Sequence, residues 1–128
     1  MSLSLAIEWD SDGWSSWAHR SKPLVDKTLH RILDGHRRYG KRFLISYFGS
    51  GGACSILKPL GALTTHDRYA IVNDDKFRFL NVNEQRKAMG FPENYILPAQ
   101  HSVATYMLGN AVCPLVMRLI IQALLTQV

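Results

Sequence analysis

The sequence predicts a small, single-domain α+β protein. Short runs of aromatic and β-branched residues, such as residues 43–48, end at Gly-rich or Asn-Asp turns and are typical of strands. Apolar residues recur at helical spacing near both ends of the chain. With 128 residues, of which 47% are hydrophobic, the chain has material for one modest core. We therefore expect a short antiparallel sheet, an N-terminal helix and a long apolar C-terminal helix.

The N-terminal third divides into an irregular segment and a helix. Residues 7–20 show no clear period, and we expect loops and turns there, packed down by Trp9, Trp14 and Trp17. From Pro23 onward the apolar spacing predicts a helix of about three turns, because proline suits a first helical turn. Gly35 and Gly40 are its two candidate ends.

The middle of the chain predicts the sheet. Residues 43–48 form an expected strand that enters a glycine loop at residues 49–52. Residues 69–72 and 77–80 flank an Asn-Asp-Asp-Lys turn at residues 73–76. This arrangement predicts a β-hairpin.

The C-terminal third predicts two helices separated by a loop. Residues 83–89 favour a short helix, which Gly90 and the following Phe-Pro pair end. We expect a loop over residues 93–105 and then a helix from Val112 to the C-terminus, apolar on two sides and interrupted by Arg118 and Gln122. Such a helix needs partners on both sides. The sequence thus predicts an exposed apolar patch suited to self-association or to a second subunit.

The charge is concentrated in one stretch. The chain has a formal net charge of +5, and residues 20–42 contain eight Lys or Arg residues against two Asp residues. A polyanion such as double-stranded DNA is the partner that this run suggests. The alternative is an ordinary solvated helix face.

Other classes of protein find little support in the sequence. Cys54 and Cys113 are too few for a disulfide framework, and with the five histidines they form no metal-ligand spacing, so we expect no metal site. No run of about 18 uncharged apolar residues occurs, and the N-terminus lacks the order of a signal peptide. Cytoplasmic localisation without a membrane partner is the default expectation.

Two motifs near the C-terminus resemble the last two motifs of the DNA (cytosine-5-)methyltransferases. They are Asn-Glu-Gln-Arg-Lys-Ala-Met-Gly-Phe-Pro at residues 83–92 and Gly-Asn-Ala-Val at residues 109–112. The resemblance extends from about Phe43 to Leu125. It implies that residues 1–80 are a target-recognition-like region and that residues 81–128 carry the C-terminal motifs. Asn83 departs from the arginine that helps to hold the recognition and catalytic domains together in this family.

The second motif implies a cofactor contact. In the family this turn touches the methionine part of S-adenosylmethionine, so Asn110, Ala111 and Val112 would form part of that site. A Gly-Asn turn at a helix start can offer backbone amides and a side-chain amide to a carboxylate. The alternative is a plain helix cap, because Asn is a favoured N-cap residue.

The recognition-like region implies a set of DNA contacts. Hydroxyl, imidazole and guanidinium groups reach phosphate oxygens, and arginine also pairs with guanine edges. Ala62 replaces the threonine of a family Thr-Leu pair. For the last residues of the set, the alternative is a capped turn in which Asp67 pairs with Arg68. The set comprises Arg37, Arg38, Lys41, Arg42, Ser50, Thr64, Thr65, His66 and Arg68.

The catalytic half of the family is missing from the sequence. Methylation of cytosine at carbon 5 needs an attacking thiolate, which follows a proline in the family, and this chain contains Cys-Pro at residues 113–114 but no Pro-Cys. The Phe-x-Gly-x-Gly cofactor loop is also missing, so we assign no catalytic residue and only a partial S-adenosylmethionine site. Three interpretations stay open: a C-terminal fragment whose catalytic half belongs to the same longer chain, a recognition subunit of a split enzyme, and a non-catalytic DNA-binding or prophage remnant.

Overall fold

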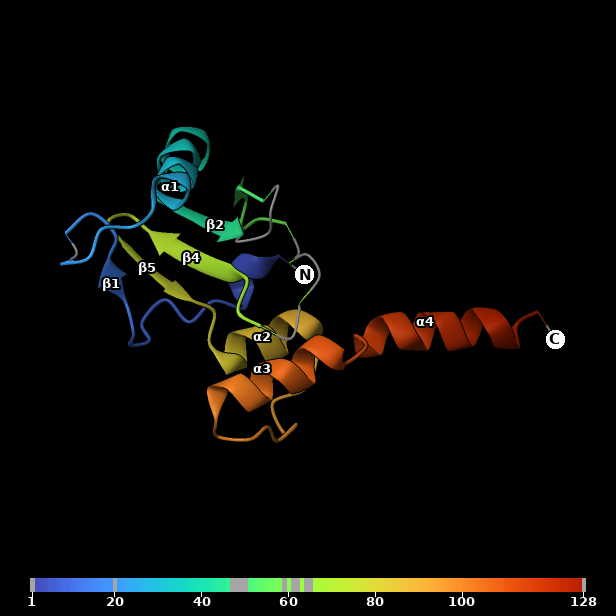
Figure 1. The fold of residues 1–128 in the computed structure, drawn as a ribbon. Coiled ribbons are helices and arrows are strands. Elements are labelled where there is room, and N and C mark those ends of the chain that lie inside the picture. The colour runs from blue at the N-terminus through green and yellow to red at the C-terminus, as the bar shows by residue number, and fades with distance from the viewer. Residues whose placement is uncertain are drawn as a thin grey trace.

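The chain folds as an α+β structure, which confirms the predicted class (Figure 1). The computed structural model describes residues 2–19, 21–46, 51–58, 60, 63 and 66–127. These residues form an antiparallel sheet with the strand order β1-β5-β4-β2-β3. Its strands are β1 (Ser15–Ser16), β2 (Arg42–Ser46), β3 (Ala53–Cys54), β4 (Tyr69–Asn73) and β5 (Lys76–Phe79).

The hairpin and the strand before it are confirmed. β4 and β5 pair with Ala70 opposite Phe79, and the turn between them contains Asp74 at a φ of 56°. β2 lies on the other side of β4, with Leu44 opposite Ile71. The predicted strand at residues 43–48 thus begins one residue earlier, and its last two residues, like the first half of the glycine loop, lie outside the described residues.

Both faces of the sheet are covered. Alternate residues point to opposite faces of a strand, so Phe43 and Ile45 contact α1 (Asp26–Tyr39) while Leu44 faces the other layer. That second layer contains the 3₁₀ turn η1 (Leu3–Leu5) and Trp9 and Trp14 of the irregular segment. Trp17 packs on the α1 side. The three tryptophans therefore hold the N-terminal segment down as predicted.

Gly40, and not Gly35, ends the first helix. Gly40 is the C-cap of α1 with a φ of 83°, a conformation that favours glycine. Gly35 is a buried residue inside the helix, where a Cβ atom would overlap the ring of Phe43 in β2. The glycine therefore serves close packing of α1 against the sheet.

The C-terminal end of α1 is fixed to the hairpin turn. The two ring nitrogens of His36 lie 2.8 Å from the carbonyl oxygen of Gly40 and 2.9 Å from that of Asp74. The indole of Trp17 donates to the same Asp74 oxygen at 2.7 Å. The basic residues that follow His36 are thus held at the end of β4 where the hairpin turns.

The C-terminal third of the structure differs from the prediction between residues 93 and 113. The short helix α2 (Val82–Met89) ends at Gly90 as expected. The predicted loop, however, contains the start of α3 (His101–Asn110), which packs on α2 and buries Ala104, Thr105 and Leu108. Three buried residues at i, i+1 and i+4 form a helical stripe that polar neighbours obscure in the sequence.

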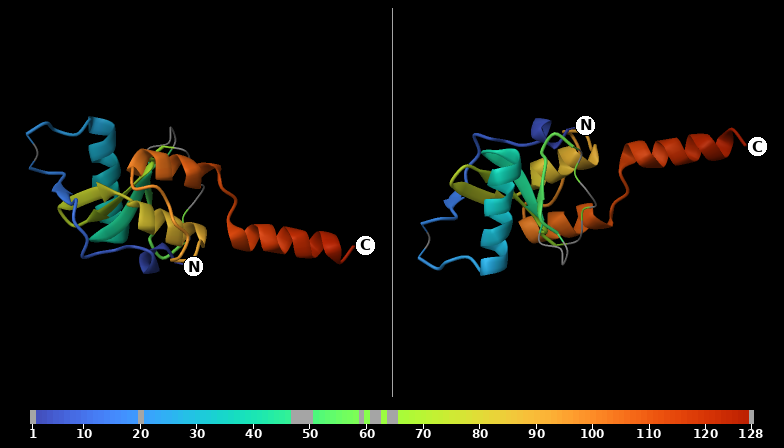
Figure 2. Two further views of the ribbon diagram at one scale, coloured as in Figure 1. Left: turned by 90° about the horizontal axis from the view of Figure 1, so that it is seen from below. Right: turned by 90° about the horizontal axis from the view of Figure 1, so that it is seen from above.

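The last helix, α4 (Pro114–Leu125), stands away from the rest of the molecule in all three views (Figures 1 and 2). None of its residues, all of which the structure describes, is buried. The exposed apolar helix predicted from the sequence is therefore confirmed. Cys113, its N-cap, is partly buried beside Gly90.

The contact between Gly35 and Phe43 gives a stability prediction. Gly35→Ala should lower the free energy of unfolding by about 1–3 kcal/mol, because overlap with a fully buried ring outweighs alanine's helix propensity of about 1 kcal/mol. Gly52→Ala is the control, because a Cβ atom there has no neighbour within 4 Å. Urea denaturation measures both, and a Gly35→Ala protein as stable as the parent would contradict this packing.

Candidate functional site

The basic residues at the end of α1 form an exposed cationic surface. Arg37 and Arg38 both approach Asp34, at 2.7 and 3.6 Å, and their side chains are 80% and 58% exposed. Exposed pairs of this kind contribute at most about 1 kcal/mol. These guanidinium groups, together with the exposed Lys41, are therefore available to a polyanion.

Arg42 differs from its basic neighbours because it has partners inside the molecule. Its guanidinium lies 4.2 Å from the ring centre of Trp9, and its Nε donates to the side-chain oxygen of Asn73 at 3.3 Å. Through the Trp9 contact, Arg42 helps to hold the N-terminal segment on the sheet. The side chain is exposed, and its DNA contact stays a prediction.

The second predicted set of DNA contacts lies at the opposite end of β4. His66 and Arg68 are exposed just before Tyr69, whereas Lys41 meets the hairpin turn after Asn73, where its carbonyl accepts from Asp74 N at 2.7 Å. The two predicted sets are thus separated by the length of β4. The remaining predicted contacts, Ser50, Thr64 and Thr65, lie outside the described residues.

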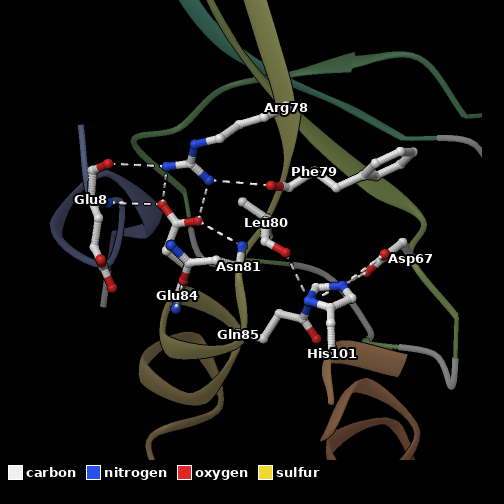
Figure 3. Close-up of polar contacts among 9 residues, drawn as sticks. All are labelled: Glu8, Asp67, Arg78, Phe79, Leu80, Asn81, Glu84, Gln85 and His101. Atoms are coloured by element: carbon white, nitrogen blue, oxygen red, sulfur yellow. Dashed lines mark hydrogen bonds and ion pairs between the residues drawn. The ribbon is translucent and has the colours of Figure 1, made fainter. Parts of the chain in front are cut away.

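Asp67 anchors the segment that carries His66 and Arg68. Its carboxylate lies 2.9 Å from His101 Nε2 at the start of α3 and accepts from Gln85 of α2 at 3.4 Å (Figure 3). The alternative pairing of Asp67 with Arg68 is therefore wrong. A pocket of about 190 Å³ opens beside this contact, lined by His66, Asp67, His101, Ser102, Thr105 and Tyr106.

The predicted cofactor turn lies between two helices, and its expected geometry is wrong. Gly109 and Asn110 form the last turn of α3, Ala111 is its C-cap, and the next helix starts only at Pro114. A helix C-terminus presents carbonyl oxygens, so Asn110 does not cap a helix start or offer a cradle of amides there. Asn110 and Val112 are nevertheless exposed, next to the junction with α4.

A buried hydrogen-bond network surrounds Glu84, and we did not predict it from the sequence. The Glu84 carboxylate accepts hydrogen bonds from both terminal nitrogens of Arg78, at 2.5 and 2.8 Å (Figure 3). It also accepts from the backbone amides of Glu8 and Asn81, each at 2.8 Å. The Asn81 side chain accepts from Glu84 N in return, which completes a capping box. The Asn-x-x-Glu spacing at residues 81–84 was the available signal.

The Arg78 side of this network reaches the N-terminal segment. The guanidinium donates to the carbonyl of Glu8 at 3.0 Å and lies 4.5 Å from the ring centre of Trp14. One carboxylate therefore joins β5, α2 and the N-terminal segment. Glu84 belongs to the motif at residues 83–92, so this motif helix is fixed rigidly to the sheet.

Among the residues that the structure describes, no base is hydrogen-bonded to the Cys54 thiol. Cys54 is exposed, and its Sγ lies 3.8 Å from the carbonyl of Gly52. The pKa of Tyr69 is raised above its ordinary value by burial and then by nearby Cys54. Among the described residues, no group of three His, Cys, Asp or Glu side chains is placed to hold a metal ion.

The exposed C-terminal helix is part of a long hydrophobic stretch of the chain. Residues His101–Leu125 are long and apolar enough, with a mean hydropathy of 1.7, to cross a membrane by length and composition. The α-helix is interrupted at residues 111–113. Large apolar side chains cover α4 on several sides, including Leu115, Leu119, Ile120, Leu124 and Leu125.

The Glu84 network gives a second stability prediction. Glu84→Gln should lower the free energy of unfolding by about 3–5 kcal/mol, because it leaves the buried guanidinium of Arg78 without its counter-charge. Asp34→Asn is the matched control at an exposed pair and should cost less than about 1 kcal/mol. Similar urea midpoints for the two variants would contradict a central role for Glu84.

The chain is similar to one known protein family over nearly its whole length. A family model described as C-5 cytosine-specific DNA methylase matches residues 10–126. No curated protein and no solved structure matches the chain significantly. Members of this family methylate cytosine in DNA and generally use S-adenosylmethionine. Since the match covers far more than half of the sequence, the chain belongs to the C-5 cytosine-specific DNA methylase family.

Proposed function

We propose that this chain is the target-recognition and C-terminal region of a DNA (cytosine-5-)methyltransferase, and that it works with a catalytic half supplied by the same longer protein or by a separate subunit. The family match supports the reaction class. The sequence lacks the Pro-Cys pair from which the family's attacking thiolate comes. On this proposal, the chain positions DNA and completes the site, and the catalytic half supplies the nucleophile.

The exposure of α4 is the observation that carries this proposal. Leu119 and Leu124 are 56% and 61% exposed, and Arg118 and Gln122 are the polar residues on the middle turns. An isolated helix of 12 residues gains little stability from its own hydrogen bonds. Burial against the catalytic half would supply the apolar contact that the helix lacks.

DNA is the polymeric substrate that the family implies. We propose that Arg37, Arg38 and Lys41 contact phosphates, because they form the exposed basic end of α1. His66 and Arg68, with Ser50, Thr64 and Thr65, form a second proposed contact region. Phosphate contacts at both ends of β4 would fix the register of the duplex along the sheet.

We propose that Asn110, Ala111 and Val112 complete an S-adenosylmethionine site whose other walls come from the catalytic half. Their position at the α3–α4 junction supports this role, because docking of α4 would bring that junction against the partner. The contact would come from the exposed side-chain amide of Asn110 and not from a helix N-terminus.

A separate recognition subunit is the second candidate. The hydrophobic clusters on the two faces of the sheet favour independent folding of the described residues ahead of α4. A chain that folds, binds DNA and gains methyl transfer only on mixing with a second chain would support this candidate.

Salt-dependent DNA binding is the first prediction from the proposed function. The isolated chain should bind a mixed duplex, with an affinity that falls as salt rises. Changing Arg37, Arg38 and Lys41 to alanine should reduce the slope of log affinity against log salt by about 2–3, because each phosphate contact contributes about 0.9. Fluorescence anisotropy over a salt series measures this slope.

The control variant removes three positive charges from other parts of the surface. Lys22, Lys87 and Arg118 are at least partly exposed and lie outside the proposed contact regions, so their replacement by alanine should leave the slope nearly unchanged. Equal slopes for the two triple variants would mean that the end of α1 is a solvated face. The isolated chain should transfer no methyl group to DNA from labelled S-adenosylmethionine, and transfer by it would overturn the division of roles.

Removing the apolar character of α4 gives a further prediction. The double variant Leu119→Glu and Leu124→Glu should change the free energy of unfolding by less than about 0.5 kcal/mol, because both side chains are exposed. It should also abolish any self-association seen in sedimentation velocity. Leu80→Glu, at a residue only 2% exposed, should unfold the chain. Strong destabilisation by the α4 variant would show that this helix is packed internally.

A further inference from the structure

Arg86 is a buried cation without a counter-charge. The residue is 5% exposed, yet among the described residues no carboxylate lies within ion-pair distance of its guanidinium. Arginine keeps its charge at any pH that a folded protein meets, so it cannot relieve this burial by losing a proton. Buried charges are stable when they are paired. Arg78, the other buried arginine in this region, has Glu84 as its partner.

The guanidinium of Arg86 is anchored on one side only. Its Nη1 donates to the carbonyl of Phe91 at 2.9 Å, which holds the chain as it leaves α2. Among the residues with described positions, that is its only hydrogen bond. In contrast to Arg78 Nε, none of its nitrogens is both enclosed and unbonded. The remaining donors therefore reach solvent.

Arg86 lines a pocket of about 440 Å³ between α2 and the segment that leads to α3. Asn83, one helical turn earlier, lies on the same wall and can donate from its side-chain amide. Tyr95, Leu97 and Pro98 also line the pocket and contribute apolar surface. The lining thus combines anion-binding groups with a surface for an organic group.

Two further titratable residues line the pocket. Glu93 is exposed and lies beyond ion-pair distance of Arg86, so it does not neutralise the guanidinium. His101 is paired with Asp67. Among the described residues, no carboxylate therefore competes for the solvent-reaching donors of Arg86, and an anion from elsewhere can bind them.

We propose that this pocket binds a phosphate ester, with Arg86 as its anion-binding group. The planar fork of a guanidinium matches two oxygens of a phosphate. The pocket is larger than a bare phosphate and has the volume of a small-molecule site, which leaves room for a sugar or base against Tyr95. This site is distinct from the proposed phosphate contacts of α1. The ester is either a free nucleotide or a backbone phosphate of DNA.

The test uses the chain with three probes: inorganic phosphate, a 5′-deoxymononucleotide and a short duplex. Saturable shifts of the Arg86 Nε–H signal by NMR should accompany binding. Arg86→Met should weaken binding of the probe that the parent chain binds by at least about tenfold, whereas Arg118→Met, at an exposed arginine outside the proposed phosphate contacts, should leave that binding unchanged. If the ligand is a free nucleotide, the mononucleotide should shift the Arg86 Nε–H signal. If the ligand is a backbone phosphate of DNA, only the duplex should shift it.

Two surface variants keep the test valid if Arg86→Met fails to fold. Asn83→Asp changes an exposed residue and places a carboxylate one turn from Arg86, so it should abolish binding while retaining the melting temperature. Glu93→Gln removes a repelling charge and should strengthen binding. The proposal is overturned if no probe shifts the Arg86 Nε–H signal, or if Asn83→Asp binds as the parent does.

Discussion

The carboxylate of Glu84 is the group on which the rest of this structure depends. It is fully buried, and it joins the N-terminal segment, β5 and the start of α2 through four hydrogen bonds to Arg78, Glu8 and Asn81. A carboxylate can be buried at this depth because two charge-assisted bonds and two backbone amides replace its water. Since α3 packs on α2, the positions of both helices on the sheet depend on this network.

The molecule therefore has two mechanically different regions. Residues up to α3 pack on both sides of a sheet, whereas α4 makes no burying contact within the described residues. This division suits the recognition region that we propose, which would be rigid where it meets DNA and open where it meets a catalytic half. On the same proposal, the α3–α4 junction, with Asn110 and Val112, would face the catalytic half.

Much of the fold could be predicted because its signals are local. The Asn-Asp turn set the hairpin, and Gly90 with the following proline set the end of α2. The helix α3 was missed because its buried stripe is short, its first turn is polar and its end was interpreted as a Gly-Asn turn. At the site, the basic end of α1 could be predicted from charge alone. The contact of Arg42 with Trp9 joins residues more than 30 positions apart, and the contact of Glu84 with Glu8 joins residues more than 70 positions apart. No local sequence pattern encodes such contacts.

Native-state hydrogen exchange tests this division into a rigid and an open region most directly. The amides of Glu8 and Asn81, which donate to Glu84, should exchange only with global unfolding, together with those of β4. The amides of α4 should exchange through local opening, at least about a hundredfold faster, until a partner covers the helix. Exchange of the Glu8 and Asn81 amides at the rate of α4, or protection of α4 equal to that of β4, would contradict the account.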